Sequence, residues 1–112
     1  MPNTYFQFKQ FRINQERAAL KVSTDSCLFG AWVAMELRTN KYEIKSVLDI
    51  GAGTGLLMLM IAQQCDALIS GIEIDQASYE QANENIKASN WNSRLNLFLA
   101  DVKQFQFHTK YD

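Results

Sequence analysis

The chain has 112 residues, of which 47% are hydrophobic and 12% aromatic, and its formal net charge is −1. This composition excludes a disordered tail and provides enough apolar material for one compact core. The sequence has no run of about 18 apolar residues, which is the length that a membrane-spanning helix needs. The N-terminus lacks a basic region followed by an apolar one, so we expect a cytoplasmic protein that is not embedded in a membrane.

The front and the rear of the chain differ in charge, and each contains one cysteine. Residues 1–45 contain seven Lys or Arg against four Asp or Glu, whereas residues 46–112 contain four against eight. The front is therefore basic and the rear acidic. Cys27 and Cys65 stand among apolar neighbours at no metal-ligand spacing, so we predict reduced core side chains and no metal site.

The front part, residues 1–45, predicts a hairpin arm followed by a helix. Aromatic and branched residues alternate roughly over residues 5–13, which is typical of a half-buried strand. Thr24, Asp25 and Ser26 are capping residue types, and they precede an expected amphipathic helix over residues 27–38. The apolar positions of that helix are Leu28, Ala31, Trp32 and Met35. A polar connection follows over residues 40–45.

The rear part alternates strands and helices. We predict short buried strands over residues 46–50, 67–74 and 95–99, and helices over residues 56–64 and 76–88. This alternation favours a parallel sheet with right-handed crossovers. Asp75 is the expected N-cap of the second of these helices. The residues expected to face inward from that helix are Ala77, Tyr79, Ala82 and Ile86.

Three glycines stand between the first of these strands and its helix, in the segment that begins at Asp49. Gly51, Gly53 and Gly55 occupy the position where an open α/β sheet binds its ligand, and glycine allows the backbone a tight turn there. The alternatives are a structural turn or a dinucleotide loop. A dinucleotide fingerprint needs Gly or Ala at its sixth position, which is Leu56 here, so NAD is disfavoured.

Acidic residues follow the next two strands. Glu73 ends the second strand, where its carboxylate can accept hydrogen bonds from both hydroxyls of a ribose. Asp101 follows the third strand, where it can accept a hydrogen bond from the exocyclic amine of an adenine. Because the carboxyl ends of parallel strands meet at one edge of a sheet, the glycine loop and both acids together predict an adenosine-bearing ligand.

These motifs resemble those of the class I S-adenosylmethionine-dependent methyltransferases, whose loop has the form Asp-x-Gly-x-Gly-x-Gly. The resemblance implies S-adenosylmethionine as cofactor, with its methionine part at the glycine loop, which Asp49 fixes. It also implies the ribose at Glu73 and the adenine at Asp101, the Val102 amide and Ile74. The fold it implies is α/β, a partial Rossmann-like methyltransferase fold with the first three parallel strands and their helices, preceded by the N-terminal hairpin and helix.

The front segment closely resembles the start of the bacterial tRNA1(Val) adenine-N6 methyltransferase family. The resemblance implies tRNA as a partner and assigns Lys21, Thr24 and Asp25 to the amino-acid end of the cofactor. Ser23 and Ser26 depart from the family, in which glycine is expected at both positions. The matching segments are residues 8–11, 21–25 and 28–32, and the match continues to residue 101.

Basic residues near the N-terminus and the absence of a catalytic motif lead to two further predictions. Lys9, Arg12 and Arg17 are candidates for contacts with RNA phosphates, and the alternative is a solvated hairpin face. In the family, an Asn-Pro-Pro-Tyr motif holds the target amine, but Pro2 is the only proline here. We therefore predict no catalytic residue in these 112 residues and no methyl transfer by the chain alone.

The sequence gives a division of the chain into two parts and leaves alternative hypotheses for its function. We expect residues 1–45 to form an arm on the side of the cofactor and substrate, and residues 46–112 to form the first half of the cofactor-binding domain. A related methyltransferase acting on guanine-N2 in ribosomal RNA or on a protein glutamine is an alternative, as is a remnant that binds cofactor without catalysis. The first strand of such a sheet is normally central, so an exposed edge there favours self-association.

Overall fold

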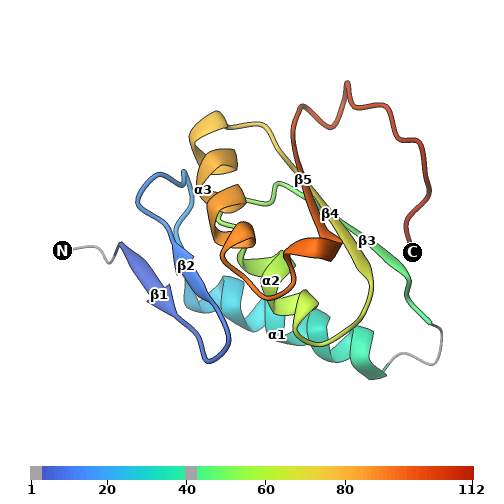
Figure 1. Cartoon of the computed structure of the whole chain (residues 1–112), viewed down its shortest axis with the longest axis horizontal. Helices are drawn as coiled ribbons and strands as arrows, with labels where there is room; N and C mark the ends of the chain where they lie inside the picture. The colour runs from blue at the N-terminus through green and yellow to red at the C-terminus, as the bar shows by residue number, and fades with distance from the viewer. Residues whose placement is uncertain (1–3, 40–42) are drawn as a thin grey trace.

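The structure is a computed structural model that describes residues 4–39 and 43–112 (Figure 1). Residues 1–3, and residues 40–42 of the expected polar connection, lie outside the described residues. Within the described ranges, no helix is long and apolar enough to cross a membrane. The elements in chain order are β1 (Tyr5–Gln7), β2 (Arg12–Asn14), α1 (Thr24–Thr39), β3 (Ser46–Ile50), α2 (Leu56–Ala62), β4 (Leu68–Glu73), α3 (Gln76–Lys87), the 3-10 turn η1 (Asn92–Arg94) and β5 (Leu95–Leu99).

The strands form two separate sheets. β1 and β2 pair antiparallel, with Phe6 opposite Ile13, which confirms the predicted hairpin. β3, β4 and β5 form a parallel sheet in that order, with Asp49 of β3 opposite Gly71 of β4 and Gly71 opposite Leu97 of β5. The fold is therefore mixed α/β, as predicted, and β3 is an outer strand of its sheet.

The core lies between the parallel sheet and the helices that cover one of its sides (Figure 1). All residues of α2 except Leu57 are buried, because the helix is apolar around almost its whole circumference. The hairpin adds Phe11 and Ile13 to this core. Trp91 packs edge-on against Phe11, with ring centroids 6.0 Å apart.

α1 packs on α2 through small side chains, and the face predicted for it is wrong. Gly30 and Ala34 are the buried residues of α1, and a Cβ at Gly30 would lie 2.4 Å from Sδ of Met60. A side chain at Gly30 would push the end of Met60 aside, so the small residues on this face let the two helices approach closely. The positions expected on the apolar face are exposed instead: Leu28, Ala31, Trp32 and Met35.

α3 buries polar side chains, which the sequence pattern did not indicate. Ala82 and Ile86 face inward as predicted, but Ala77 is exposed and Tyr79 is only half-buried. The polar residues that are buried instead are Ser78, Gln81 and Asn85. The hairpin arm lies against this face of α3, and its backbone N–H groups need acceptors there. Polar side chains supply those acceptors.

The chain after β5 returns across the sheet face opposite to the helices. Asp112 donates its backbone N–H to the carbonyl of Ser46 at 3.0 Å, and its carboxylate accepts from the amides of Lys45 and Ser46. Ring contacts of 4.8–6.1 Å between centroids connect Phe98, Phe105, Phe107 and Tyr111 in series. The last residue therefore lies beside the start of β3, and Figure 1 shows the segment curving from β5 around to that strand.

Candidate functional site

The glycine loop connects β3 to α2 at the carboxyl edge of the parallel sheet. Gly51, Gly53 and Gly55 have φ angles of 80°, 58° and 84°, a region that other residues rarely adopt. A Cβ on Gly51 or Gly53 would meet no described atom within 4 Å, so the backbone angle requires glycine there and the space beside the loop is open. A Cβ on Gly55 would make an ordinary contact with Ala82 at 3.6 Å, so the positive φ angle is what favours glycine there as well.

Glu73 holds this loop against the start of α3. Its Oε1 accepts a hydrogen bond from Gly53 N at 2.8 Å, and its Oε2 accepts one from Asp75 N at 2.9 Å. The carboxylate is almost fully buried. Because each carboxylate oxygen has two lone pairs, both oxygens keep an acceptor site for a further donor. Asp75 is the N-cap of α3, as predicted, and accepts from Ser78 N at 2.9 Å.

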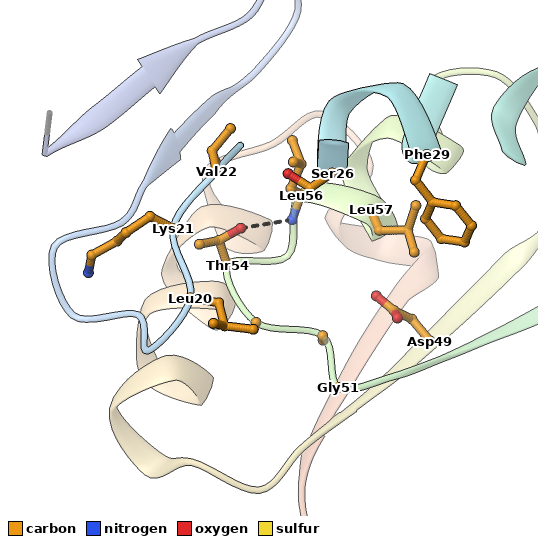
Figure 2. A pocket seen from close by; sticks show the side chains of 12 residues that line it. Leu20, Lys21, Val22, Ser26, Phe29, Asp49, Gly51, Thr54, Leu56 and Leu57 are labelled. Carbon is orange, nitrogen blue, oxygen red and sulfur yellow. Dashed lines mark hydrogen bonds between the residues drawn. The ribbon is translucent and has the colours of Figure 1, made fainter. Parts of the chain in front are cut away.

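Asp49 carries a buried oxygen without a partner. Among the described residues, its Oδ2 is the one buried side-chain oxygen or nitrogen atom that has no hydrogen-bond partner. Burial, with the nearby charge of Glu73 as the smaller cause, raises the pKa of Asp49 to about 6. Figure 2 shows the carboxylate pointing toward Leu57, beside the glycine loop. An unpaired buried acceptor is costly, so this position suits a cationic donor.

The glycine-loop pocket, of about 190 Å³, opens beside these residues (Figure 2). Three segments enclose it: the glycine loop with the start of α2, the first turns of α1, and residues 20–22. These last residues end the arm, which here means the hairpin and the segment that follows it up to residue 22. Its lining is mainly apolar, with Asp49 as the acidic group. The lining residues that lie outside the glycine loop are Leu20, Lys21, Val22, Ser26, Phe29, Leu56 and Leu57.

Lys21 belongs to this lining, but its charge is directed elsewhere. Its Nζ donates hydrogen bonds to the carbonyls of Gln15 at 2.6 Å, Glu16 at 3.2 Å and Ala18 at 2.6 Å. Figure 2 shows the ammonium end pointing away from the pocket. The arrangement therefore does not bring the Lys21 charge to the place that the resemblance implies.

The start of α1 also differs from the expectation. Thr24 and Asp25 lie exposed in its first turn and are not among the lining residues, whereas Ser26 is. The helix begins at Thr24, three residues earlier than expected, so the predicted capping residues lie in its first turn. Ser23 Oγ accepts from Ser26 N at 3.1 Å, and Ser26 Oγ accepts from Ser23 N at 2.9 Å. The two serines that replace the expected glycines thus form a reciprocal capping pair.

A second pocket of about 140 Å³, the Asp101 pocket, lies on the other side of Gly51. The structure brings Ile74, Asp101 and Val102 together there, as the sequence predicts. Ile74 is 67% exposed and presents an apolar surface, and Asp101 supplies the acidic group of the lining. Since Gly51 lines both pockets, a ligand with a flat apolar part and a cationic polar part can extend across that residue. The remaining lining residues are Ile50, Ile72 and Ala100.

The three candidate phosphate contacts have different environments. Lys9 is exposed in the turn of the hairpin. Arg12 stacks over the ring of Tyr5 at 3.7 Å and donates to Asn14 Oδ1 at 3.2 Å. Arg17 forms an ion pair with Glu84 of α3. Arg17 therefore already has an anionic partner, whereas the contacts of Arg12 are with the uncharged side chains of Tyr5 and Asn14.

Metal-binding side chains do not gather in the described ranges. No group of three His, Cys, Asp or Glu side chains there could hold a metal ion. Cys27 and Cys65 are free and half-buried, and both pack against the hydrophobic core.

Similar proteins are known both by sequence and by structure. Residues 47–112 match the family described as a methyltransferase domain. The chain is 44% identical over its whole length to the tRNA1(Val) (adenine(37)-N6)-methyltransferase of Phocaeicola vulgatus and 46% identical to the protein of that name from Cytophaga hutchinsonii. It spans 45% and 46% of these two relatives.

Solved structures of methyltransferases share the fold. The plantazolicin methyltransferase BpumL in complex with a monoazolic desmethylPZN analog and SAH superposes with a TM-score of 0.60 at 28% identity, over 80% of this chain and 33% of that one. An S-adenosyl-L-methionine-dependent methyltransferase described as putative, from Methanococcus maripaludis, gives a TM-score of 0.66 at 27% identity, over 79% and 41%. With the family match covering more than half of its residues, the chain belongs to the methyltransferase domain family.

Proposed function

We propose that this chain is the S-adenosylmethionine-binding part of a tRNA adenine-N6 methyltransferase. The observation that carries the proposal is the buried, unpartnered Oδ2 of Asp49 beside a loop of three glycines with positive φ. The cofactor has an α-ammonium group, which is the kind of donor that this carboxylate lacks. Open space beside Gly51 and Gly53 leaves room for the methionine part to approach the backbone.

The adenosine part of the cofactor fits the opposite side of the loop. In this proposal Glu73 accepts from the ribose hydroxyls with its remaining lone pairs, while it keeps its bonds to the backbone of Gly53 and Asp75. The adenine lies against Ile74, with Asp101 accepting from the exocyclic amine and Val102 donating its backbone N–H. The pocket that these last three residues line supports this assignment.

The chemistry requires little from this part of the protein beyond binding and orientation. The cofactor supplies a methyl group on a sulfonium, so that a carbon–nitrogen bond forms as the carbon–sulfur bond breaks and the amine loses a proton. The residues of this chain hold the donor in one position and keep its charged end paired with Asp49. Such positioning is a large share of the rate enhancement for a transfer between two bound partners.

The proposed substrate, adenine N6 of a tRNA, rests on the relatives. Those that match the whole chain are named tRNA1(Val) (adenine(37)-N6)-methyltransferases, and each is about twice as long. In the proposal, residues 1–45 form the arm on the RNA side and residues 46–112 the cofactor-binding unit. Lys9 and Arg12 contact phosphates, and Arg17 does so by exchanging Glu84 for a phosphate. With a tRNA as substrate, we propose that the protein acts in the cytoplasm.

Titration with S-adenosylhomocysteine by calorimetry tests the cofactor site. The chain should bind it, and Glu73→Ala should weaken binding about tenfold to a hundredfold, because a charged acceptor is worth roughly 1.5–3 kcal/mol. Glu80→Ala, at an exposed position of α3, is the matched control and should bind like the natural chain. Equal affinity for all three proteins would show that Glu73 does not hold the ribose.

A chimera tests the proposed substrate. This chain replaces the matching segment of the Phocaeicola vulgatus relative, and the nucleosides of treated tRNA1(Val) are analysed by mass spectrometry. N6-methyladenosine should appear with the chimera and disappear when Glu73→Ala is introduced. A chimera that is folded and binds S-adenosylhomocysteine but methylates no adenine would contradict the proposed substrate and leave the cofactor site standing.

A further inference from the structure

Three buried polar side chains of α3 face the arm. Ser78, Gln81 and Asn85 are 1%, 1% and 2% exposed, and their spacing of three and four residues places them on one face of the helix. Each accepts a hydrogen bond from a backbone N–H of the arm. Ser78 Oγ accepts from Ala19 N at 2.9 Å, Gln81 Oε1 accepts from Arg17 N at 3.3 Å, and Asn85 Oδ1 accepts from Asn14 N at 2.9 Å.

Asn85 differs from the other two because it also reaches the glycine loop. Its Nδ2 donates to the carbonyl of Asn14 at 2.8 Å and to the carbonyl of Thr54 at 2.9 Å. Thr54 immediately precedes Gly55, whose φ is positive. One buried amide group therefore binds both polar groups of an arm residue and, at the same time, a carbonyl of the loop that lines the proposed cofactor pocket.

The arm supplies the opposite wall of that pocket. Leu20, Lys21 and Val22 line the glycine-loop pocket. They follow directly on the segment that α3 holds, and Gln15 Oε1 ties Val22 back to it by accepting from Val22 N at 2.9 Å. The distance between this wall and the glycine loop thus depends on how the arm is fixed to α3.

Apolar packing alone would leave the register of the arm loosely defined. Ile13 and Ala18 are buried, but the hydrophobic contacts they make have no preferred direction. Hydrogen bonds are directional, and the three bonds of Asn85 connect the arm and the loop through one rigid amide plane.

We propose that Asn85 is a positioning residue of the cofactor site. Its amide holds the arm wall, residues 20–22, at a fixed spacing from the glycine loop, so that binding in the pocket between them depends on a residue that does not line it. The inference rests on the proposed function in that the ligand is taken to be S-adenosylmethionine or S-adenosylhomocysteine.

Three variants of the chain test this role. Asn85→Leu removes all three bonds at similar side-chain size, and Ser78→Ala removes one bond on the arm side only. Asn83→Leu, at a half-buried position of the same helix, is the control. Thermal unfolding first identifies a temperature at which each variant is folded, and the affinity for S-adenosylhomocysteine is measured there. A merely structural role would lower the melting temperature and leave the affinity of the folded protein unchanged.

Asn85→Leu should weaken S-adenosylhomocysteine binding by about tenfold or more, and Ser78→Ala by a smaller factor, whereas the control should bind normally. A folded Asn85→Leu protein with natural affinity would overturn the proposal. Should that variant not fold, Asn85→Ser, which keeps a hydroxyl too short to bridge arm and loop, is measured in its place and judged in the same way.

Hydrogen exchange without ligand separates this inference from the proposed function. In Asn85→Leu, exchange should accelerate both at the arm amides of Arg17, Ala19 and Val22 and at the loop amides of Gly53 and Gly55. In Ser78→Ala it should accelerate more at the arm than at the loop. If the natural chain binds no S-adenosylhomocysteine, the proposed function fails, and this exchange pattern alone decides the role of Asn85. Acceleration confined to the arm in Asn85→Leu would overturn it.

Discussion

Asp49→Asn should make the protein more stable and the cofactor site weaker. The folded protein raises the pKa of Asp49 from 3.8 to about 6, mainly through burial. Well below pH 3.8 the carboxyl is protonated in both the folded and the unfolded chain, and no cost arises. As the pH rises to about 6, the unfolded chain releases its proton first, so stability falls over this range and stays lower above it.

The size of the effect follows from that shift. A rise from 3.8 to about 6 at 1.36 kcal/mol per unit corresponds to about 3 kcal/mol of stability absent at neutral pH. An amide does not ionise, so the variant should regain up to about this amount at pH 7.5. The regained stability is reduced by the part of the amide that finds no partner in the site.

The same substitution should weaken S-adenosylhomocysteine binding by about tenfold to a hundredfold, because a neutral amide pairs less strongly with an ammonium than a carboxylate does. The affinity of the natural chain should rise between about pH 5 and pH 7 as Asp49 ionises, whereas the affinity of the variant should stay nearly constant. Exposed Asp66→Asn is the control, and it should change neither stability nor affinity by much.

Urea denaturation from pH 4.5 to 8 and calorimetric titration at the same pH values measure both effects. The stability difference between variant and natural chain should grow with pH and then level off above about pH 6. A difference that stays constant over the range would refute the argument that Asp49 is a buried titrating group. Unchanged S-adenosylhomocysteine affinity in the variant would refute its pairing with the ammonium.

Three further variants, the last with two substitutions, have expected outcomes. Gly53→Ala should lower the free energy of unfolding by roughly 1–2 kcal/mol in urea denaturation, because its φ is 58°, and an unchanged value would contradict the strain argument. Gly30→Val should destabilise by about 1–3 kcal/mol, because its side chain collides with Met60, and an unchanged melting temperature would mean that α1 packs differently. Replacing Lys9 and Arg12 by Gln should flatten the salt dependence of tRNA binding by about one unit of slope per contact, and an unchanged slope would favour a solvated hairpin face.

The elements that the sequence predicted well are those with a local signal. β3 and β5 have the predicted bounds, because each is a short apolar run between turn residues. Asp75 caps α3 as expected, since a capping side chain acts on an amide three residues away. The parallel sheet followed from the alternation of strands and helices.

The elements that the sequence predicted poorly are those whose burial depends on residues far away in the sequence. Nothing near Asn85 indicates burial, because its partner Asn14 is 71 positions away in the sequence. A pattern based on apolar residues therefore predicts Ala77 and Tyr79 as inward-facing positions. For α1 a signal was present: a glycine inside a helix costs stability and points to close packing, and Gly30 has that role.

The residues of the candidate site also differ in whether a local sequence signal predicts them. The glycine loop, Glu73 and Asp101 are recognisable because each follows a strand at a defined position. The ammonium of Lys21 binds three arm carbonyls, which depends on how residues 15–21 fold back on themselves. No pattern of residue types encodes that turn. The glycine-loop pocket is thus predictable from the sequence on its loop side and unpredictable on its arm side.

The two tryptophans of the chain report on these two sides separately. Trp91 packs against Phe11 of the hairpin, and Trp32 is exposed on α1, stacked 6.4 Å from Phe29, which lines the glycine-loop pocket. Indole emission depends on solvent exposure, so Trp91→Phe leaves a fluorophore beside the pocket, and Trp32→Phe leaves one on the hairpin. Stopped-flow fluorescence of the two single-tryptophan proteins would therefore give the order in which the pocket and the arm respond to a ligand.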